Sequence, residues 1–113
     1  MIGSFTIICI VCDQGFQGPQ SSANNASDIS SLANIPIYCI NFKDDIKKII
    51  SNNLVEKGFR IIFASQRAFN KDIINTPLIH AETDCSIFKY CDGEDVTLAS
   101  YNFALPETLK IRN

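Results

Sequence analysis

Residues 35–64, IPIYCINFKDDIKKIISNNLVEKGFRIIFA, carry the strongest local signal in this chain. Apolar and β-branched residues dominate both ends of the stretch, which predicts two strands. Between them, isoleucines and a leucine recur at helical spacing, Asn41 can cap the start of a helix, and Gly58 can follow its end. The stretch therefore predicts a strand, a main helix at about residues 42–57 and a second strand.

The chain before this unit divides into a strand and a loop. Residues 4–12, SFTIICIVC, are apolar on both faces of an extended chain, which is typical of a central strand covered on both sides. Residues 13–34 are rich in glycine, serine, alanine and asparagine and predict a long surface loop. The second half of this loop, at about residues 27–33, can hold a short helix capped by Ser27 or Asp28.

The C-terminal third carries a hairpin signal. Residues 85–91, CSIFKYC, can form a strand, Asp92-Gly93 is a favoured two-residue turn, and the residues after it are rich in strand formers. We therefore predict a β-hairpin at about residues 85–104. A helix at residues 83–91 is the competing interpretation of the same pattern.

Together these elements predict an α+β fold in a single domain, residues 1–113. A mixed sheet of about five strands would carry the main helix on one face and would end in the C-terminal β-hairpin. A hydrophobic fraction of 46% in 113 residues suffices for one core. We expect this core to contain Ile8, Ile10, Ile37, Ile40, Ile46, Ile50, Leu54, Ile61, Phe63, Ile87, Leu98 and Phe103.

Charge and cysteine content exclude several classes of protein. A formal net charge of −2 and a pI near 5.2 argue against binding to nucleic acid, which requires a basic surface. The apolar N-terminal residues are too few to span a bilayer and lack the basic start of a signal peptide, so we expect no membrane association. Five cysteines, an odd number placed mostly in apolar runs, predict reduced thiols in a cytoplasmic protein.

His80-Ala81-Glu82 is the best catalytic candidate in the chain. It resembles the first half of the zinc deaminase signature, H-x-E followed by P-C-x-x-C, in which a histidine and two thiolates hold zinc and the glutamate moves protons. Pro106 follows at a suitable interval, but a glutamate and a lysine occupy the two cysteine positions. The resemblance implies a zinc-dependent hydrolase with His80 as metal ligand and Glu82 as catalytic residue. Because the ligand set is incomplete, this is the alternative function.

Our leading expectation is that the chain has no catalytic residue and binds neither a cofactor nor a metal. Three acids around the predicted turn, Asp92, Glu94 and Asp95, are candidate contacts for a basic protein partner. A small acidic domain of this kind fits a non-enzymatic protein-binding domain. We expect an inhibitor or immunity-type protein that neutralises a partner such as a bacterial toxin. A composition rich in asparagine and isoleucine, with more lysine than arginine, accords with a bacterial source.

Overall fold

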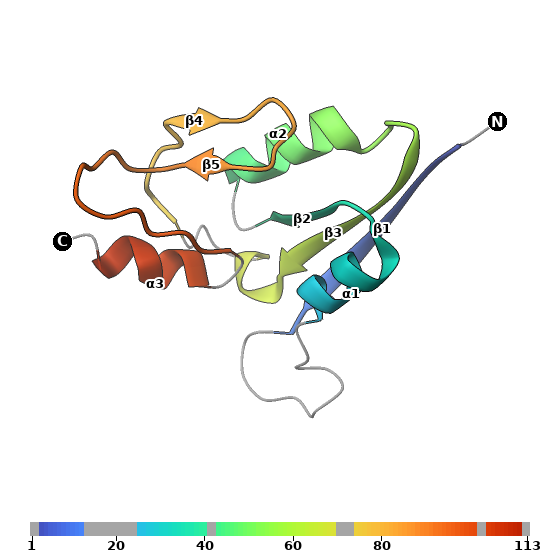
Figure 1. Cartoon of the computed structure of the whole chain (residues 1–113), viewed down its shortest axis with the longest axis horizontal. Helices are drawn as coiled ribbons and strands as arrows, with labels where there is room; N and C mark the ends of the chain where they lie inside the picture. The colour runs from blue at the N-terminus through green and yellow to red at the C-terminus, as the bar shows by residue number, and fades with distance from the viewer. Residues whose placement is uncertain (1–2, 13–24, 41–42, 70–73, 102–103, 112–113) are drawn as a thin grey trace.

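The computed structural model of the chain describes residues 3–12, 25–40, 43–69, 74–101 and 104–111. Its elements follow one another along the chain as shown in Figure 1: β1 (Ser4–Val11), α1 (Ala26–Ala33), β2 (Ile37–Ile40), α2 (Lys43–Asn53), β3 (Gly58–Ser65), the 3₁₀ turn η1 (Gln66–Ala68), β4 (His80–Ala81), β5 (Phe88–Lys89) and α3 (Ala104–Ile111). Within the described ranges, no helix has the length and apolar character needed to cross a membrane.

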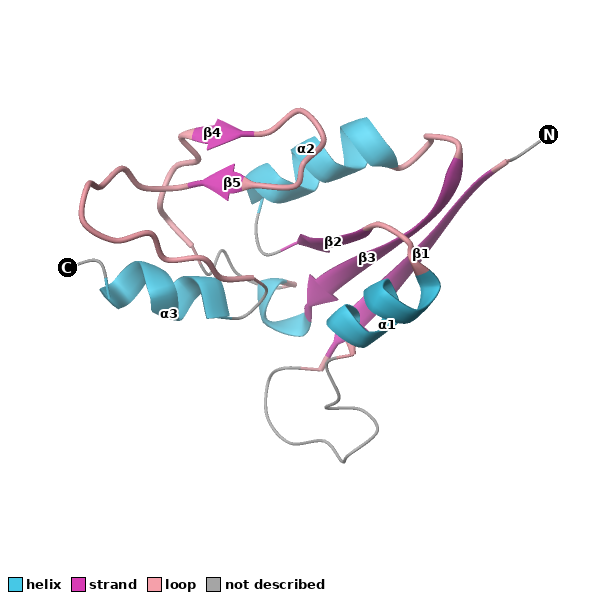
Figure 2. Ribbon diagram, in the orientation of Figure 1, coloured by secondary structure: helices cyan, strands magenta, loops and turns pink. Residues whose placement is uncertain are grey.

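β1, β3 and β2 form a parallel sheet in that order, with β3 in the centre (Figure 2). Ile7 of β1 and Ile37 of β2 both lie beside Ile61 of β3. The prediction of a strand, a helix and a strand within residues 35–64 is therefore confirmed, and its two strands are parallel neighbours. The expectation that residues 4–12 form a central strand is wrong, because β1 lies at the edge of the sheet.

Two helices cover the two faces of this sheet. Side chains alternate between the faces along a strand, so Ile61 and Phe63 point to one face and Ile62 to the other. Ile61 and Phe63 pack with Ala26 of α1, whereas Ile62 packs with Ile49 of α2. The expectation of one main helix on one face is thus incomplete. β3 is buried on both of its faces, and α1 supplies the cover opposite α2.

The fold is α+β, but the predicted mixed sheet of about five strands is wrong. β4 and β5 pair with each other in a separate antiparallel ribbon. Cys85 and Phe88 of this ribbon region contact the cluster around Ile49 and Ile62 on the α2 side of the sheet. The ribbon buries its apolar side chains against α2. It therefore packs on the α2 face of the sheet and does not add strands to it.

The predicted hairpin at residues 85–104 is wrong, and so is the competing helix at residues 83–91. The antiparallel pairing occurs earlier in the chain, and Cys85 lies in the turn between β4 and β5 with a left-handed backbone (φ 61°). Cys85 is buried against α2, where Asn52 Nδ2 donates to the Thr83 carbonyl oxygen at 3.4 Å. Burial of Cys85 holds the turn between β4 and β5 in place, and Asp92-Gly93 does not form the turn of a hairpin.

The main helix, predicted for residues 42–57, is observed as α2 and ends at Asn53, so the expectation that Gly58 directly follows its end is wrong. The expected cap Asn41 and residue 42 lie outside the described residues. The buried side chain of Arg60 in β3 organises the connection that follows. Its guanidinium donates to two hydroxyls of β1, to two carbonyl oxygens of the connection between α2 and β3, and to the carbonyl oxygen of the first residue of β3. The acceptors are Ser4 Oγ at 3.0 Å, Thr6 Oγ1 at 3.2 Å and the carbonyl oxygens of Leu54 at 3.2 Å, Gly58 at 3.2 Å and Glu56. Gly58 adopts φ 110°, a conformation that favours glycine, as the chain enters β3.

The hydrophobic core is divided into three clusters and contains only part of the predicted set. Ile40, Ile61 and Phe63 are buried as expected, and Ile37 and Ile50 are partly buried. The expectation is wrong for the exposed residues Ile8, Ile10, Ile46, Leu54, Ile87 and Leu98, whereas Phe103 lies outside the described residues. Ile8 and Ile10 are exposed because their strand is at the edge of the sheet.

The predicted loop at residues 13–34 lies only partly within the described residues, which begin again at residue 25. The expected short helix in its second half is confirmed as α1, but the expected cap at Ser27 or Asp28 is wrong, because the helix begins at Ala26 after Asn25 and both residues lie inside it. Asn34 ends this helix in a left-handed conformation, and its backbone N–H donates to the Ser30 carbonyl oxygen at 2.9 Å.

Candidate functional site

The candidate site is the loop at residues 92–101, which we call the acidic loop. It lies between β5 and α3, outside every helix and strand, at the end of the molecule opposite the N-terminus (Figure 1). All of its residues except the partly buried Ser100 are exposed. Exposed irregular segments on a folded scaffold commonly carry binding residues.

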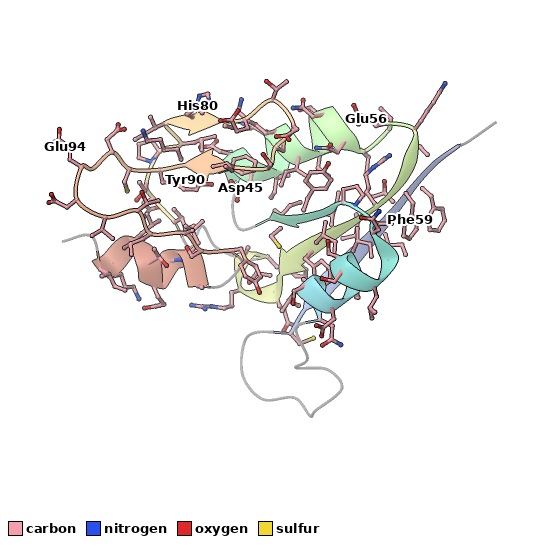
Figure 3. The ribbon with its side chains drawn as sticks, viewed as in Figure 1. Asp45, Glu56, Phe59, His80, Tyr90 and Glu94 are labelled. Carbon is pink, nitrogen blue, oxygen red and sulfur yellow. The ribbon has the colours of Figure 1, made fainter. Side chains whose placement is uncertain are left out.

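The acidic loop brings the three predicted partner-binding acids together. Asp92 Oδ1 pairs with Lys89 Nζ. Glu94 and Asp95 are exposed and have no ion-pair partner among the residues that the structure describes. Glu94 points away from the body of the protein (Figure 3). Two of the three carboxylates are therefore available to an approaching cation.

The same loop also exposes apolar side chains. Val96 is 74% exposed, and Leu98 and Tyr101, further along the loop, are exposed as well. The Ser100 hydroxyl is buried and has no hydrogen-bond partner within the described part of the chain. Carboxylates next to exposed aliphatic and aromatic groups resemble the composition of a protein interface, where apolar contacts form the centre and polar groups the rim.

Tyr90 holds the base of the acidic loop in place. Its hydroxyl donates to Asp45 Oδ1 of α2, both side chains are buried, and Figure 3 shows them pointing toward each other. The Tyr90 ring also packs with Ile74 and with Leu105 of α3. Burial in the first place, and then the hydrogen bond to Asp45, raise the pKa of the Tyr90 hydroxyl well above its usual value of 10.0, so it stays a neutral donor.

The catalytic candidates of the zinc alternative lie at the surface. Nε2 of His80 is 3.6 Å from Oε1 of Glu82, and these side chains are 61% and 52% exposed. Glu107 and Lys110, at the two cysteine positions of the deaminase signature, form an ion pair with each other at 2.8 Å. Nowhere in the described ranges do three or more His, Cys, Asp or Glu side chains come together in a group that could hold a metal ion.

Purified protein is expected to contain only trace zinc. His80 and Glu82 supply one imidazole and one carboxylate, whereas zinc sites use at least three protein ligands. Elemental analysis of protein produced with added zinc measures the content, and His80→Ala is the matched variant. One zinc per chain that is lost in His80→Ala would contradict this expectation and would revive the deaminase-like alternative.

All five cysteines lie in the described residues and are free thiols. Cys39 in β2 is partly buried against the cluster under α1. Burial, and to a lesser extent the charge of Asp45, raise the pKa of the Cys39 thiol from 9.0 to about 11. This thiol therefore stays protonated in the folded protein under mildly alkaline conditions.

Because of Cys39, the free energy of unfolding should fall as the pH rises from 9 to about 11. In that range the unfolded chain releases a thiol proton that the folded chain retains, so alkali favours unfolding by up to about 2–3 kcal/mol. Below pH 9 the contribution is constant. Urea unfolding at several pH values measures this, with Cys39→Ala as the comparison. Equal pH slopes for the wild type and Cys39→Ala would show the expectation to be wrong.

Sequence reasoning missed the importance of three buried polar residues, Asp45, Arg60 and Tyr90. Asp45 suits the first turn of a helix, and nothing in its local sequence indicates burial. Arg60 did carry a signal, because it interrupts an apolar strand, FRIIFA, where a buried guanidinium needs several acceptors. Tyr90 lies within the strand predicted for residues 85–91, where an aromatic residue is common, and gives no such signal.

Comparison with protein-family models, with curated proteins and with solved structures finds no match to this chain.

Proposed function

We propose that this chain is a non-enzymatic protein-binding domain of the inhibitor or immunity type. In this proposal the acidic loop covers a functional surface on a basic protein partner, such as a bacterial toxin. One observation carries the proposal: a single loop exposes the acids Glu94 and Asp95 together with the apolar side chains of Val96, Leu98 and Tyr101.

The apolar side chains and the carboxylates of the loop would contribute to binding in different ways. Burial of Val96, Leu98 and Tyr101 against a partner would supply most of the affinity, since aromatic and aliphatic anchors dominate interface energetics. The carboxylates of Glu94 and Asp95 would accelerate association with a positively charged surface and select against acidic partners.

The fixed base of the loop supports this role. Tyr90 hydrogen-bonds to Asp45 and packs against α3, so the loop starts from a buried anchor. A loop whose base is held in place loses less conformational entropy on binding than a free segment does.

Neutralisation by coverage requires no catalytic group in this chain. A toxin that acts on nucleic acid needs a basic surface for the phosphates, and such a surface complements the exposed acids Glu94 and Asp95 of the loop. The partner's activity should then fall in proportion to the amount of complex formed, at one chain per partner.

Reversal of the loop charges tests the proposal. The chain is immobilised, a basic protein from its native source is captured and identified, and the affinity of the purified pair is measured. Glu94→Lys with Asp95→Lys is expected to weaken binding about 10–100-fold at low salt, mainly through slower association. The loss should shrink as the salt concentration rises.

The matched control is Asp28→Lys with Glu56→Lys, which changes the net charge equally on exposed acids of α1 and of the α2–β3 connection. This control should bind its partner like the wild type. If both double variants lost affinity to the same degree, net charge and not the acidic loop would govern binding. Capture of no basic partner, or a complex that leaves the partner fully active, would refute the inhibitor role.

A further inference from the structure

β1 combines the composition of a central strand with the position of an edge strand. Residues Ser4–Val11 pair with β3 on one side, and in the described part of the chain no strand pairs with the other side. Edge strands of stable monomers are commonly blunted by charges, proline or bulges. β1 contains no charge and no proline, and it pairs with β3 in unbroken register.

The outer strand exposes apolar side chains toward both faces of the sheet. Phe5 and Ile7 lie on the α1 side, and Ile8 and Ile10 lie on the α2 side. Phe5 is 59% exposed and Ile8 is 57% exposed. Phe5 stacks on Phe59 of β3 with ring centroids 5.3 Å apart, and both rings remain exposed.

We propose that the outer edge of β1 pairs with β1 of a second copy of this chain. An occupant of this edge must be an extended strand that is apolar on both faces and does not carry charge. Within the described residues, β1 itself fits this requirement best. The side chains that one copy leaves exposed on each face are then covered by the same side chains of its partner.

Closed symmetry determines the direction of this pairing. A two-fold axis perpendicular to the sheet makes the two β1 strands antiparallel and keeps equivalent faces together, so Ile8 and Ile10 of both copies meet on the α2 side. The result is a six-stranded sheet, three strands from each copy, with β1 in its centre. This position is the one that the composition of β1 favours.

The available area indicates a weak dimer. The exposed parts of Phe5, Ile7, Ile8 and Ile10 amount to on the order of 300 Å² of apolar surface per copy. A standard interface hides about 800 Å² per partner, and the backbone of an eight-residue edge supplies only part of the difference. We therefore expect a dissociation constant of about 10–1000 μM.

The pairing leaves the acidic loop free. Glu94, at the tip of the acidic loop, lies at the far left of the molecule, whereas β1 runs along the right-hand side of the sheet (Figures 1 and 3). The dimer proposal therefore stands independently of the proposed function, and either one can fail without the other.

Sedimentation of the full chain across a range of concentrations tests the dimer. The apparent mass should rise from 12.6 kDa toward twice that value as the concentration increases. Ile8→Lys should remain monomeric throughout, because it places like charges together at the centre of the pairing. Leu32→Lys is the matched control, since Leu32 is 88% exposed on α1 and is not part of the β1 edge, and this variant should dimerise like the wild type.

Amide hydrogen exchange of the wild type tests the interface directly and does not depend on any variant folding. Every second amide of β1, those pointing away from β3, should become protected as the concentration rises. A wild type that stays monomeric at 1 mM, whether or not another protein's strand binds β1, would overturn the proposal. So would a dimer in which the β1 amides gain no protection, or one that folded Ile8→Lys forms equally well.

Discussion

Arg60→Ala is expected to lower the free energy of unfolding by about 3–5 kcal/mol. The guanidinium is buried, and among the described residues its charge is met by hydroxyl and carbonyl oxygens and not by a carboxylate. Removing it leaves the carbonyl oxygens of Glu56 and Gly58 without this donor, and only the hydroxyls of Ser4 and Thr6 then donate from the side chains of β1 to the Leu54 carbonyl oxygen. With a total stability of 5–15 kcal/mol for an ordinary domain, this loss leaves a markedly weakened protein.

Urea unfolding monitored by circular dichroism measures the effect, and two further variants define its cause. Arg60→Lys keeps the positive charge but cannot reach acceptors on both sides, so it should lose roughly half as much stability. Lys57→Ala, on an exposed cation nearby, should stay within about 0.5 kcal/mol of the wild type. A loss below about 1 kcal/mol in Arg60→Ala would mean that the hydrogen bonds of this side chain do not hold β1 in place.

The second large effect is expected from the buried pair between Tyr90 and Asp45. Asp45→Ala should lower the free energy of unfolding by about 3 kcal/mol, because it leaves the buried Tyr90 hydroxyl without this acceptor and creates a cavity. Tyr90→Phe should lower it by about 2 kcal/mol, because a buried carboxylate loses a hydrogen bond. Since the two changes remove the same contact, the double variant should lose less than their sum.

The pair also predicts how stability depends on pH. The pKa of the Tyr90 hydroxyl is raised in the folded protein, so above pH 10 the unfolded chain releases this proton first and stability falls. Tyr90→Phe should remove that part of the alkaline loss. Tyr101→Phe, on an exposed tyrosine of the acidic loop, is the control and should change neither stability nor its pH dependence. An unchanged alkaline slope in Tyr90→Phe would contradict the assignment.

These two buried contacts link the fold to the proposed binding surfaces. Arg60 joins β1 to the connection after α2, and so positions the edge proposed for pairing with a second copy. Tyr90 joins β5 to α2 and α3, and so positions the acidic loop. Substitutions at either residue should therefore be interpreted as effects on positioning, because neither side chain is exposed to a partner.

The placement of the candidate site could be predicted only in part. The exposure of Asp92, Glu94 and Asp95 agrees with the sequence analysis, because a Gly-containing acidic segment is strongly solvated. Their position in an open loop, and not in a hairpin turn, depends on Cys85 and Tyr90, which bury themselves against α2. Val96 and Leu98 are exposed because neither side chain packs into any of the three clusters of the core.

The sequence by itself determined the local units. Helical spacing of isoleucines gave α2, Gly58 directed the chain into β3, and the apolar runs on either side became parallel neighbours. Only the tertiary structure decided that β1 lies at an edge, that β4 and β5 stand apart from the sheet, and that Asp45 is buried. Hydrophobic periodicity and helix capping depend on residues a few positions apart, so the sequence alone is enough to predict individual helices and strands. The position of a strand at the sheet edge and the burial of a polar side chain depend on which distant segments pack together. That packing is determined by the contacts of the whole core and not by any local segment.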